Sequence, residues 1–174
     1  MSIFYKEDAM QHVQTRSTTS ALVLTAVLIA LATLFTMYTK IPVPGIRGYF
    51  NVGDVVIMTS ALLLGRKYGA YIGAIGPALA DLFLGYAVFV PITFVVKGIE
   101  GYLVGTVYNN KTTTSALVAT IVGGIVIVAG YFIAEYFVFD PGVAIASILT
   151  NTIQAVMSVI ISMILYAILR KRLG

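Results

Sequence analysis

Six long apolar runs, separated by short polar or turn-forming segments, most constrain how this 174-residue chain can fold. A helix that crosses a bilayer needs about 20 mostly apolar residues. Backbone polar groups must be satisfied inside the bilayer, so these runs predict helices rather than isolated strands. The predicted helices cover residues 20–38, 52–64, 68–84, 88–108, 115–139 and 143–169. We therefore predict an all-α fold, a membrane bundle of six transmembrane helices forming a single domain over residues 1–174.

The composition supports this class and excludes several others. The chain is 59% hydrophobic and only 10% charged, whereas soluble domains carry roughly 25% charged residues. It has no cysteine and one histidine, His12, so disulfides, thiol catalysis and cysteine-based zinc sites are excluded. A Walker-A loop and the common hydrolase motifs are also absent. We predict no catalytic residues, no metal and no cofactor, and thus a protein that is not an enzyme.

The positions of the basic residues predict the orientation of the bundle. Six spans place both termini on the same side of the membrane. If that side is the cytoplasm, eight lysines and arginines lie inside and two, Lys40 and Arg47, lie outside, as the positive-inside rule requires. The inside set is Lys6, Arg16, Arg66, Lys67, Lys111, Arg170, Lys171 and Arg172. Residues 1–17 are accordingly predicted to be a cytoplasmic segment.

Polar residues within the apolar spans are the main candidates for a binding site. A charge at the bilayer centre costs about 2.5–3.5 kcal/mol, so each one needs a reason to be there. In the predicted orientation most of them gather in the outer half of the membrane. Aromatic rings nearby could stack on a ligand. The predicted substrate-binding residues are Asn51, Asp81, Phe94, Lys97, Tyr131, Glu135, Asn151 and Gln154. The structural alternative is that Lys97 pairs with Asp81 or Glu100.

The segment between the first two helices is unusual for a simple connection. Residues 39–51 combine two prolines and two glycines with two basic and two aromatic side chains, and they lie on the predicted outer side. The residues that set it apart are Pro44, Gly45, Arg47, Tyr49 and Phe50, and the family resemblance described below implies that they form a gating loop.

Small residues recur at helical spacing in several spans. Gly69, Gly73 and Gly76 form such a series in the third span, and Ala26 and Ala30 form a pair in the first. Small residues allow helix backbones to approach closely in lipid. Packing inside the bundle explains any one of these series. Docking onto another membrane protein is the sharper alternative, and it suits Ala26 and Ala30 best because a first helix often lies on the outside of a bundle.

Four stretches of the chain together resemble one known family. They are 50–54 (FNVGD), 62–69 (LLLGRKYG), 76–82 (GPALADL) and 93–101 (TFVVKGIEG). These stretches resemble the substrate-binding S components of energy-coupling factor (ECF) vitamin transporters. The similarity extends over nearly the whole chain and is closest to the branch that takes up riboflavin-like compounds, hydroxymethylpyrimidine or pyridoxine.

The resemblance implies a function and a set of partners. Such proteins are six-helix bundles of the bacterial or archaeal cell membrane, with a vitamin site near the outer face and a loop, here 39–51, that closes over it. The helix face with Ala26 and Ala30 would dock on the transmembrane coupling (T) subunit, and two cytoplasmic ATPases would supply energy. Tryptophan is often prominent in the vitamin pockets of this family, and this chain has none, so stacking on the ligand would fall to phenylalanine or tyrosine. We therefore expect a smaller ring, hydroxymethylpyrimidine or pyridoxine ahead of riboflavin, and a thiamine-type site is less expected.

Two other functions stay open from the residues alone. Asp81, Lys97 and Glu135 could relay protons in a stand-alone, proton-coupled carrier. Paired carboxylates such as Asp54 and Asp81 could serve acid–base chemistry in an intramembrane enzyme, although no nucleophile or metal site accompanies them.

Overall fold

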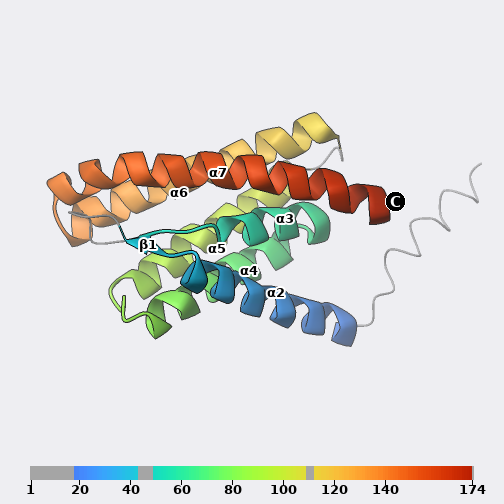
Figure 1. Cartoon of the computed structure of the whole chain (residues 1–174), viewed down its shortest axis with the longest axis horizontal. Coiled ribbons are helices and arrows are strands. Elements are labelled where there is room, and N and C mark those ends of the chain that lie inside the picture. The colour runs from blue at the N-terminus through green and yellow to red at the C-terminus, as the bar shows by residue number, and fades with distance from the viewer. Residues whose placement is uncertain (1–17, 43–48, 109–111, 174) are drawn as a thin grey trace, which may run out of the picture.

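A computed structural model describes residues 18–42, 49–108 and 112–173 of the chain (Figure 1). The described residues form six helices, as predicted, and each helix begins within two residues of its expected start. The helices are α2 (Thr18–Tyr38), α3 (Asp54–Leu64), α4 (Arg66–Phe83), α5 (Phe89–Val107), α6 (Thr113–Val138) and α7 (Pro141–Leu173).

The segment between α2 and α3 differs from the irregular loop that we expected. Its two ends form short strands, β1 (Ile41–Pro42) and β2 (Tyr49–Phe50), which pair antiparallel. The base of the segment is closed by the hydroxyl Oγ1 of Thr39, which accepts a hydrogen bond from the Val52 amide at 3.0 Å. The two arms of the segment are therefore held together where they leave the helices.

Local side chains and backbone geometry account for several helix ends. Asp140 precedes α7, and its Oδ1 accepts hydrogen bonds from the amides of Gly142 and Val143 at 2.8 and 3.0 Å. Thr112 caps α6 by accepting from the Ser115 amide at 3.1 Å. Gly65 separates α3 from α4 with a φ of 90°, a conformation that glycine adopts without the steric cost other residues incur.

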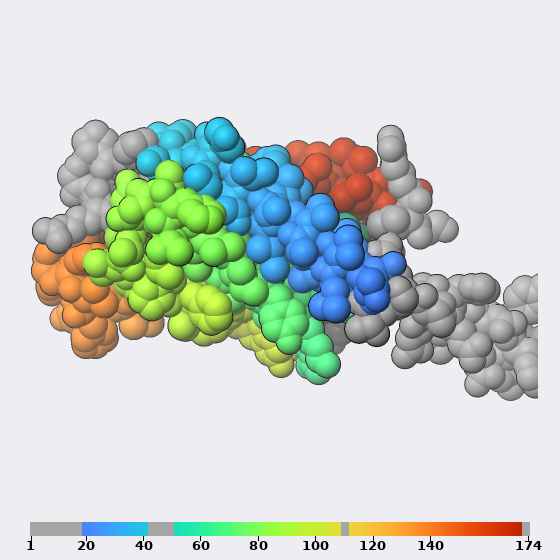
Figure 2. All heavy atoms as spheres, turned by 90° about the horizontal axis from the view of Figure 1, so that it is seen from below, coloured from blue at the N-terminus to red at the C-terminus, as the bar shows by residue number. Residues whose placement is uncertain are grey.

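The helices pack in two groups, which meet through α5 and α6 and also through α3. Helix α6 lies along α7, and α4 packs against both α2 and α5. The short α3 contacts α4, α5 and α7, so it lies inside the bundle between the groups (Figure 1). Figure 2 shows one outer face of the molecule, where blue α2 lies against the green residues of the neighbouring helices. Helix α3 is accordingly the most buried of the six, with nine buried residues from Asp54 to Leu62.

Glycines bring the backbones of α4 and α5 into direct contact. A Cβ added at Gly73 would clash with the carbonyl oxygen of Lys97, and one at Gly101 would clash with the carbonyl oxygen of Gly69. A Cβ at Gly76 would lie 2.8 Å from that of Ala32 in α2. These glycines therefore serve packing within the bundle, the first of the two interpretations of the small-residue series.

Four of the described helices are long and apolar enough to cross a membrane. They are α2, α5, α6 and α7, over Thr19–Tyr38, Phe89–Val107, Thr113–Val138 and Pro141–Lys171. Helix α3 has only 11 residues, which is about 16 Å of helix, and α4 includes Arg66, Lys67 and Asp81. The outer faces carry exposed apolar side chains such as Leu22 and Phe137, as expected where lipid is the solvent. The chain is thus a multi-pass membrane protein.

Candidate functional site

A small cavity lies at the end of the bundle where α2, α4 and α6 finish and α5 and α7 begin. Its volume is about 40 Å³, which is room for a few water molecules. Side chains from five helices and from the residue that follows β2 surround it. The lining residues are Thr36, Asn51, Pro77, Asp81, Phe89, Thr93, Lys97, Tyr131, Glu135, Ser147, Thr150, Asn151 and Gln154.

Lys97, which lines the cavity, belongs to a buried ion cluster. The ammonium of Lys97 lies 2.5 Å from Oδ1 of Asp54 and 3.4 Å from Oε2 of Glu100. Asp54 is the first residue of α3, and Lys97 and Glu100 lie on one face of α5, three residues apart. All three residues are at most 1% exposed. A charge in this position is tolerated only when it is paired, so the cluster ties α3 to α5.

An amide links the ion cluster to the segment before α3. Nε2 of Gln154 donates a hydrogen bond to Oδ2 of Asp54 at 2.7 Å, and Oε1 of the same amide accepts one from the backbone N–H of Asn51 at 3.1 Å. Oδ1 of Asn51 in turn accepts from the Gly53 amide at 2.8 Å. Both ends of the Gln154 amide are therefore engaged, which fixes its orientation and joins α7 to the start of α3.

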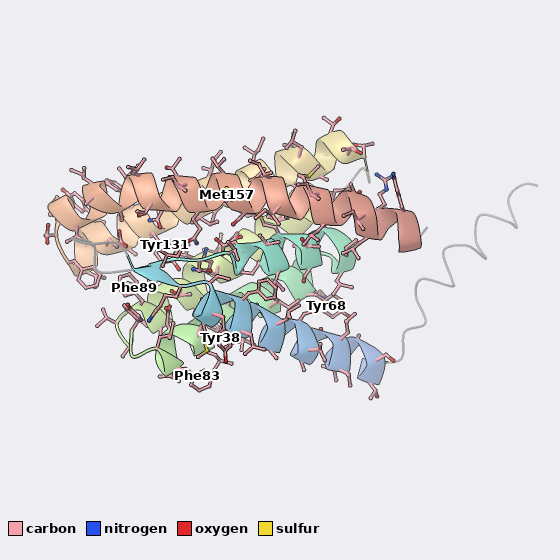
Figure 3. All side chains as sticks on the ribbon, viewed as in Figure 1. Tyr38, Tyr68, Phe83, Phe89, Tyr131 and Met157 are labelled. Carbon is pink, nitrogen blue, oxygen red and sulfur yellow. The ribbon has the colours of Figure 1, made fainter. Side chains whose placement is uncertain are left out.

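Aromatic side chains form the wall beside the lysine. The Lys97 ammonium lies 5.4 Å from the centre of the Tyr131 ring, a cation–π distance. The Tyr131 hydroxyl is hydrogen-bonded to that of Thr93 at 3.0 Å. Figure 3 labels Tyr131 and Phe89, which lie at the same end of the bundle, away from Tyr68. The cavity thus offers ring faces next to polar atoms, the combination typical of small-molecule sites.

Two further carboxyl groups line the cavity, and both are buried. Glu135, at the end of α6, accepts a hydrogen bond from the Ser147 hydroxyl of α7. Asp81 lies near the end of α4, and it and Glu135 are each 3% exposed. Nowhere in the described ranges do three His, Asp or Glu side chains group as a metal site. The carboxyl groups are therefore suited to binding hydrogen-bond donors or positive charge.

Some polar atoms in the cavity wall have no hydrogen-bond partner among the described residues. They include the Thr36 hydroxyl and the amide nitrogen of Asn151. Thr36 is 1% exposed, so water does not reach its hydroxyl freely. An unpaired buried polar group costs about 1–3 kcal/mol, and a ligand that pairs with these atoms would recover that free energy.

The structure brings together seven of the eight predicted substrate-binding residues. These are Asn51, Asp81, Lys97, Tyr131, Glu135, Asn151 and Gln154. The exception is Phe94, which is 50% exposed and points away from the cavity that Thr93 and Lys97 line. Phe89, five residues earlier on α5, lines the cavity in its place. Their position around one cavity is observed, whereas substrate binding by these residues is still a prediction.

Sequence reasoning missed the main partner of Lys97 and several cavity residues. The sequence offered Asp54 as a carboxylate that could act together with Asp81, whereas the structure pairs it with Lys97. The expected pairing of Lys97 with Glu100 is present. Thr36, Thr93, Ser147 and Thr150 carried no signal, because single hydroxyl residues are common in membrane helices and their spacing does not show which way they face.

The other predicted residues fall at the edge of the described structure or on its surface. Pro44, Gly45 and Arg47 lie outside the described residues, as does His12. The backbones of Tyr49 and Phe50 form β2. Ala26 and Ala30 are both exposed on α2, so this small-residue face is available to a partner, and docking there is still a prediction.

Comparison with known proteins gives one family match and two clear relatives. Residues 16–171 match the family described as the ECF-type riboflavin transporter S component. A Pyrococcus woesei protein, described as an uncharacterized protein in the gap 3′ region, is 42% identical over 145 residues, 82% of this chain and 96% of its own length. The thiamine precursor transporter HmpT of Lactococcus lactis subsp. cremoris is 30% identical over 149 residues, 84% of this chain and 83% of its own length.

The ion cluster gives a prediction about stability. We expect Lys97→Met to lower the free energy of unfolding by about 3–5 kcal/mol, because it leaves buried carboxylates without a cation. Adding Asp54→Asn should recover a large part of the loss by removing one of those charges. Thermal unfolding of the purified protein in detergent measures both, with the exposed Lys67→Met as the control. Equal stability of the Lys97 and Lys67 variants would contradict a structural role for the cluster.

Proposed function

Because the chain belongs to the ECF-type riboflavin transporter S component family, we propose that it captures hydroxymethylpyrimidine or a closely similar single-ring vitamin or precursor at the outer face of the cell membrane. The family match and the transporter relative make it a component of a vitamin transporter and not an enzyme. The family that the chain resembles is thereby confirmed as its own. The observation that carries the choice of ligand is the small cavity with ring faces and unpaired donors.

The size and lining of the cavity support a single-ring ligand. The cavity is narrow, and its wall has two aromatic residues, Phe89 and Tyr131. A pyrimidine or pyridine ring needs less space than the three fused rings of riboflavin. The transporter relative is named for a thiamine precursor, which agrees with this choice. A bound ring requires the cavity to widen, and we propose that segment 39–51 opens and closes its entrance.

We assign the residues in and beside the cavity to three roles. Asn151 and Thr36 present the unpaired donor groups and would bind the ring nitrogen or hydroxyl of the ligand. Phe89 and Tyr131 would flank the ring. The side chains of Asp54, Lys97 and Gln154 already have partners, so we propose that they hold the wall in place. For Gln154 we therefore replace the predicted contact with the ligand by a positioning role in the cavity wall.

The arrangement of basic residues supports an outward-facing cavity. Arg66, Arg170 and Lys171 lie at the α3–α4 junction and near the end of α7, opposite the cavity (Figure 1). The positive-inside rule would place that end in the cytoplasm. We therefore propose six crossings, including the short α3 and the charged α4, with both termini inside a bacterial or archaeal cell.

The family also supports a set of partners. We propose that the chain works with a transmembrane T subunit, which docks on the α2 face with Ala26 and Ala30, and with two cytoplasmic ATPases. The Walker-A motif is absent from the sequence, so the energy for import would come from those subunits.

Ligand binding is testable on the purified protein. In calorimetry against hydroxymethylpyrimidine, pyridoxine, riboflavin and thiamine, we expect hydroxymethylpyrimidine or pyridoxine to bind most tightly. Asn151→Ala should weaken that binding about 10-fold or more, because a donor–acceptor pair contributes roughly 1–3 kcal/mol when its loss leaves a buried group unpaired. Thr152→Ala, next in sequence but outside the cavity, should bind normally. Absence of binding by all four compounds would refute the proposal.

The orientation can be tested because the chain has no cysteine. Single variants Ala87→Cys, in the α4–α5 turn at the cavity end, and Lys171→Cys, near the end of α7, would be treated with a membrane-impermeant maleimide on intact cells. We expect labelling at position 87 in intact cells and at position 171 only after the membrane is permeabilised. The reverse pattern would show the cavity facing the cytoplasm.

The energy source can be tested by reconstitution. We expect proteoliposomes with the chain alone to show no accumulation of radiolabelled ligand under a proton gradient, and those with the T subunit, both ATPases and ATP to accumulate it. Uptake by the chain alone that collapses with the gradient would instead support the proton-coupled carrier. A Walker-A lysine variant of the ATPases is the control for ATP-dependent uptake.

A further inference from the structure

The charges around the cavity are strongly unbalanced. Asp81 and Glu135 line it directly, and each of them is 3% exposed. Lys97 is the one cation that lines the cavity within the described ranges. Among the described residues, two buried carboxyl groups thus line a space that offers a single ammonium group, and that ammonium is shared with the carboxyl groups of Asp54 and Glu100.

The charge of Lys97 is already matched. Its ammonium contacts Asp54 at 2.5 Å and Glu100 at 3.4 Å, and one ammonium cannot neutralise two carboxylates. Lys40, which follows the end of α2, lies 5.4 Å from the centre of the Tyr86 ring and is not part of the cavity wall. An anionic ligand would therefore find no unpaired positive side chain among the described lining residues.

The helix N-termini at this end do not supply a substitute anion site. Free amides at a helix N-terminus can bind phosphate, but at α7 the amides of Gly142 and Val143 bond to Asp140. At α5 the amides of Phe89 and Val90 bond to carbonyls of the preceding turn. At α3 the first residue is Asp54 itself, whose negative charge offsets the helix dipole. The amides that could hold a phosphate group are already engaged.

The unpaired groups in the wall instead suit a neutral ligand. The Thr36 hydroxyl, 1% exposed, and the Asn151 amide nitrogen have no hydrogen-bond partner among the described residues. Neutral donors of this kind bind ring nitrogens and hydroxyls without a change in charge, and the carboxyl groups of Asp81 and Glu135 can accept from an amino group or a protonated ring.

From this balance we infer that the cavity selects by charge: it accepts the neutral or cationic form of its ring ligand and rejects the phosphate ester of the same compound. The inference rests on the proposed function and adds a specificity to it. Asp81 and Glu135 are the residues that determine this specificity, because their carboxyl groups would face the phosphate in a buried site where like charges repel strongly.

Matched ligand pairs test the inference. Binding of hydroxymethylpyrimidine and its phosphate, and of pyridoxine and pyridoxine 5′-phosphate, is measured by calorimetry on the full chain in detergent near pH 7.5. We expect each phosphate ester to bind at least about 100-fold more weakly than its parent compound. Asp81→Asn and Glu135→Gln should each lower the ratio of the dissociation constant of the phosphate ester to that of the parent compound by about 10-fold or more. Thr152→Ala changes an exposed residue outside the cavity and should leave the ratio unchanged.

The outcomes separate this inference from the proposed function. If the parent compounds bind and their phosphates bind equally well or better, selection by charge is wrong while vitamin capture stands. If the phosphates are rejected and the ratio stays the same in both carboxyl variants, Asp81 and Glu135 are not its cause. If none of the four compounds binds, the proposed function fails and the inference fails with it. The parent-to-phosphate ratio of the unaltered chain tests selection even if a variant does not fold.

Discussion

An ammonium group buried among apolar helices must be matched by negative charge, and much of this bundle is arranged around that requirement. Lys97 on α5 meets Asp54 at the start of α3 and Glu100 one turn further along its own helix. Asp54 also accepts a hydrogen bond from Gln154 on α7, and Gln154 in turn accepts one from the backbone N–H of Asn51. Three helices and the segment that follows β2 therefore take their relative positions from one buried charge.

Close helix packing makes this arrangement possible. Gly73 lets α4 approach the backbone of α5 at Lys97 itself, and Lys97 is 1% exposed. The interior of the bundle combines hydrophobic clusters with buried polar residues, while large apolar side chains cover its outer faces. This arrangement suits a protein whose solvent is lipid and whose cargo is polar, because the cost of dehydrating a polar ligand is met by partners already in place.

The helices were predictable, because the length and limits of apolar runs are properties of consecutive residues. The end of α2 at Tyr38 and the break at Gly65 could be placed from prolines, glycines and charges nearby. The strand pair was not predicted, because it forms only when the chain turns back and brings residue 50 beside residue 41. Much of the cavity was foreseen from a simple rule: polar residues are costly in apolar spans, so those present have a function. Phe94 shows where that rule stops, because its neighbour Thr93 faces the cavity and Phe94 does not.

The sequence by itself determined that lipid surrounds this protein, where its helices lie and to which family it belongs. It also determined which polar residues the bundle has to bury. Only the tertiary structure decided which of those residues are partners. Lys97 and Asp54 are 43 positions apart, and Gln154 and Asp54 are 100 apart, so no local spacing reveals their contact. Rotation of each helix about its axis chooses which side chains face inward, and packing against all neighbours sets that rotation. The excess of carboxyl groups around the cavity emerges only from that packing.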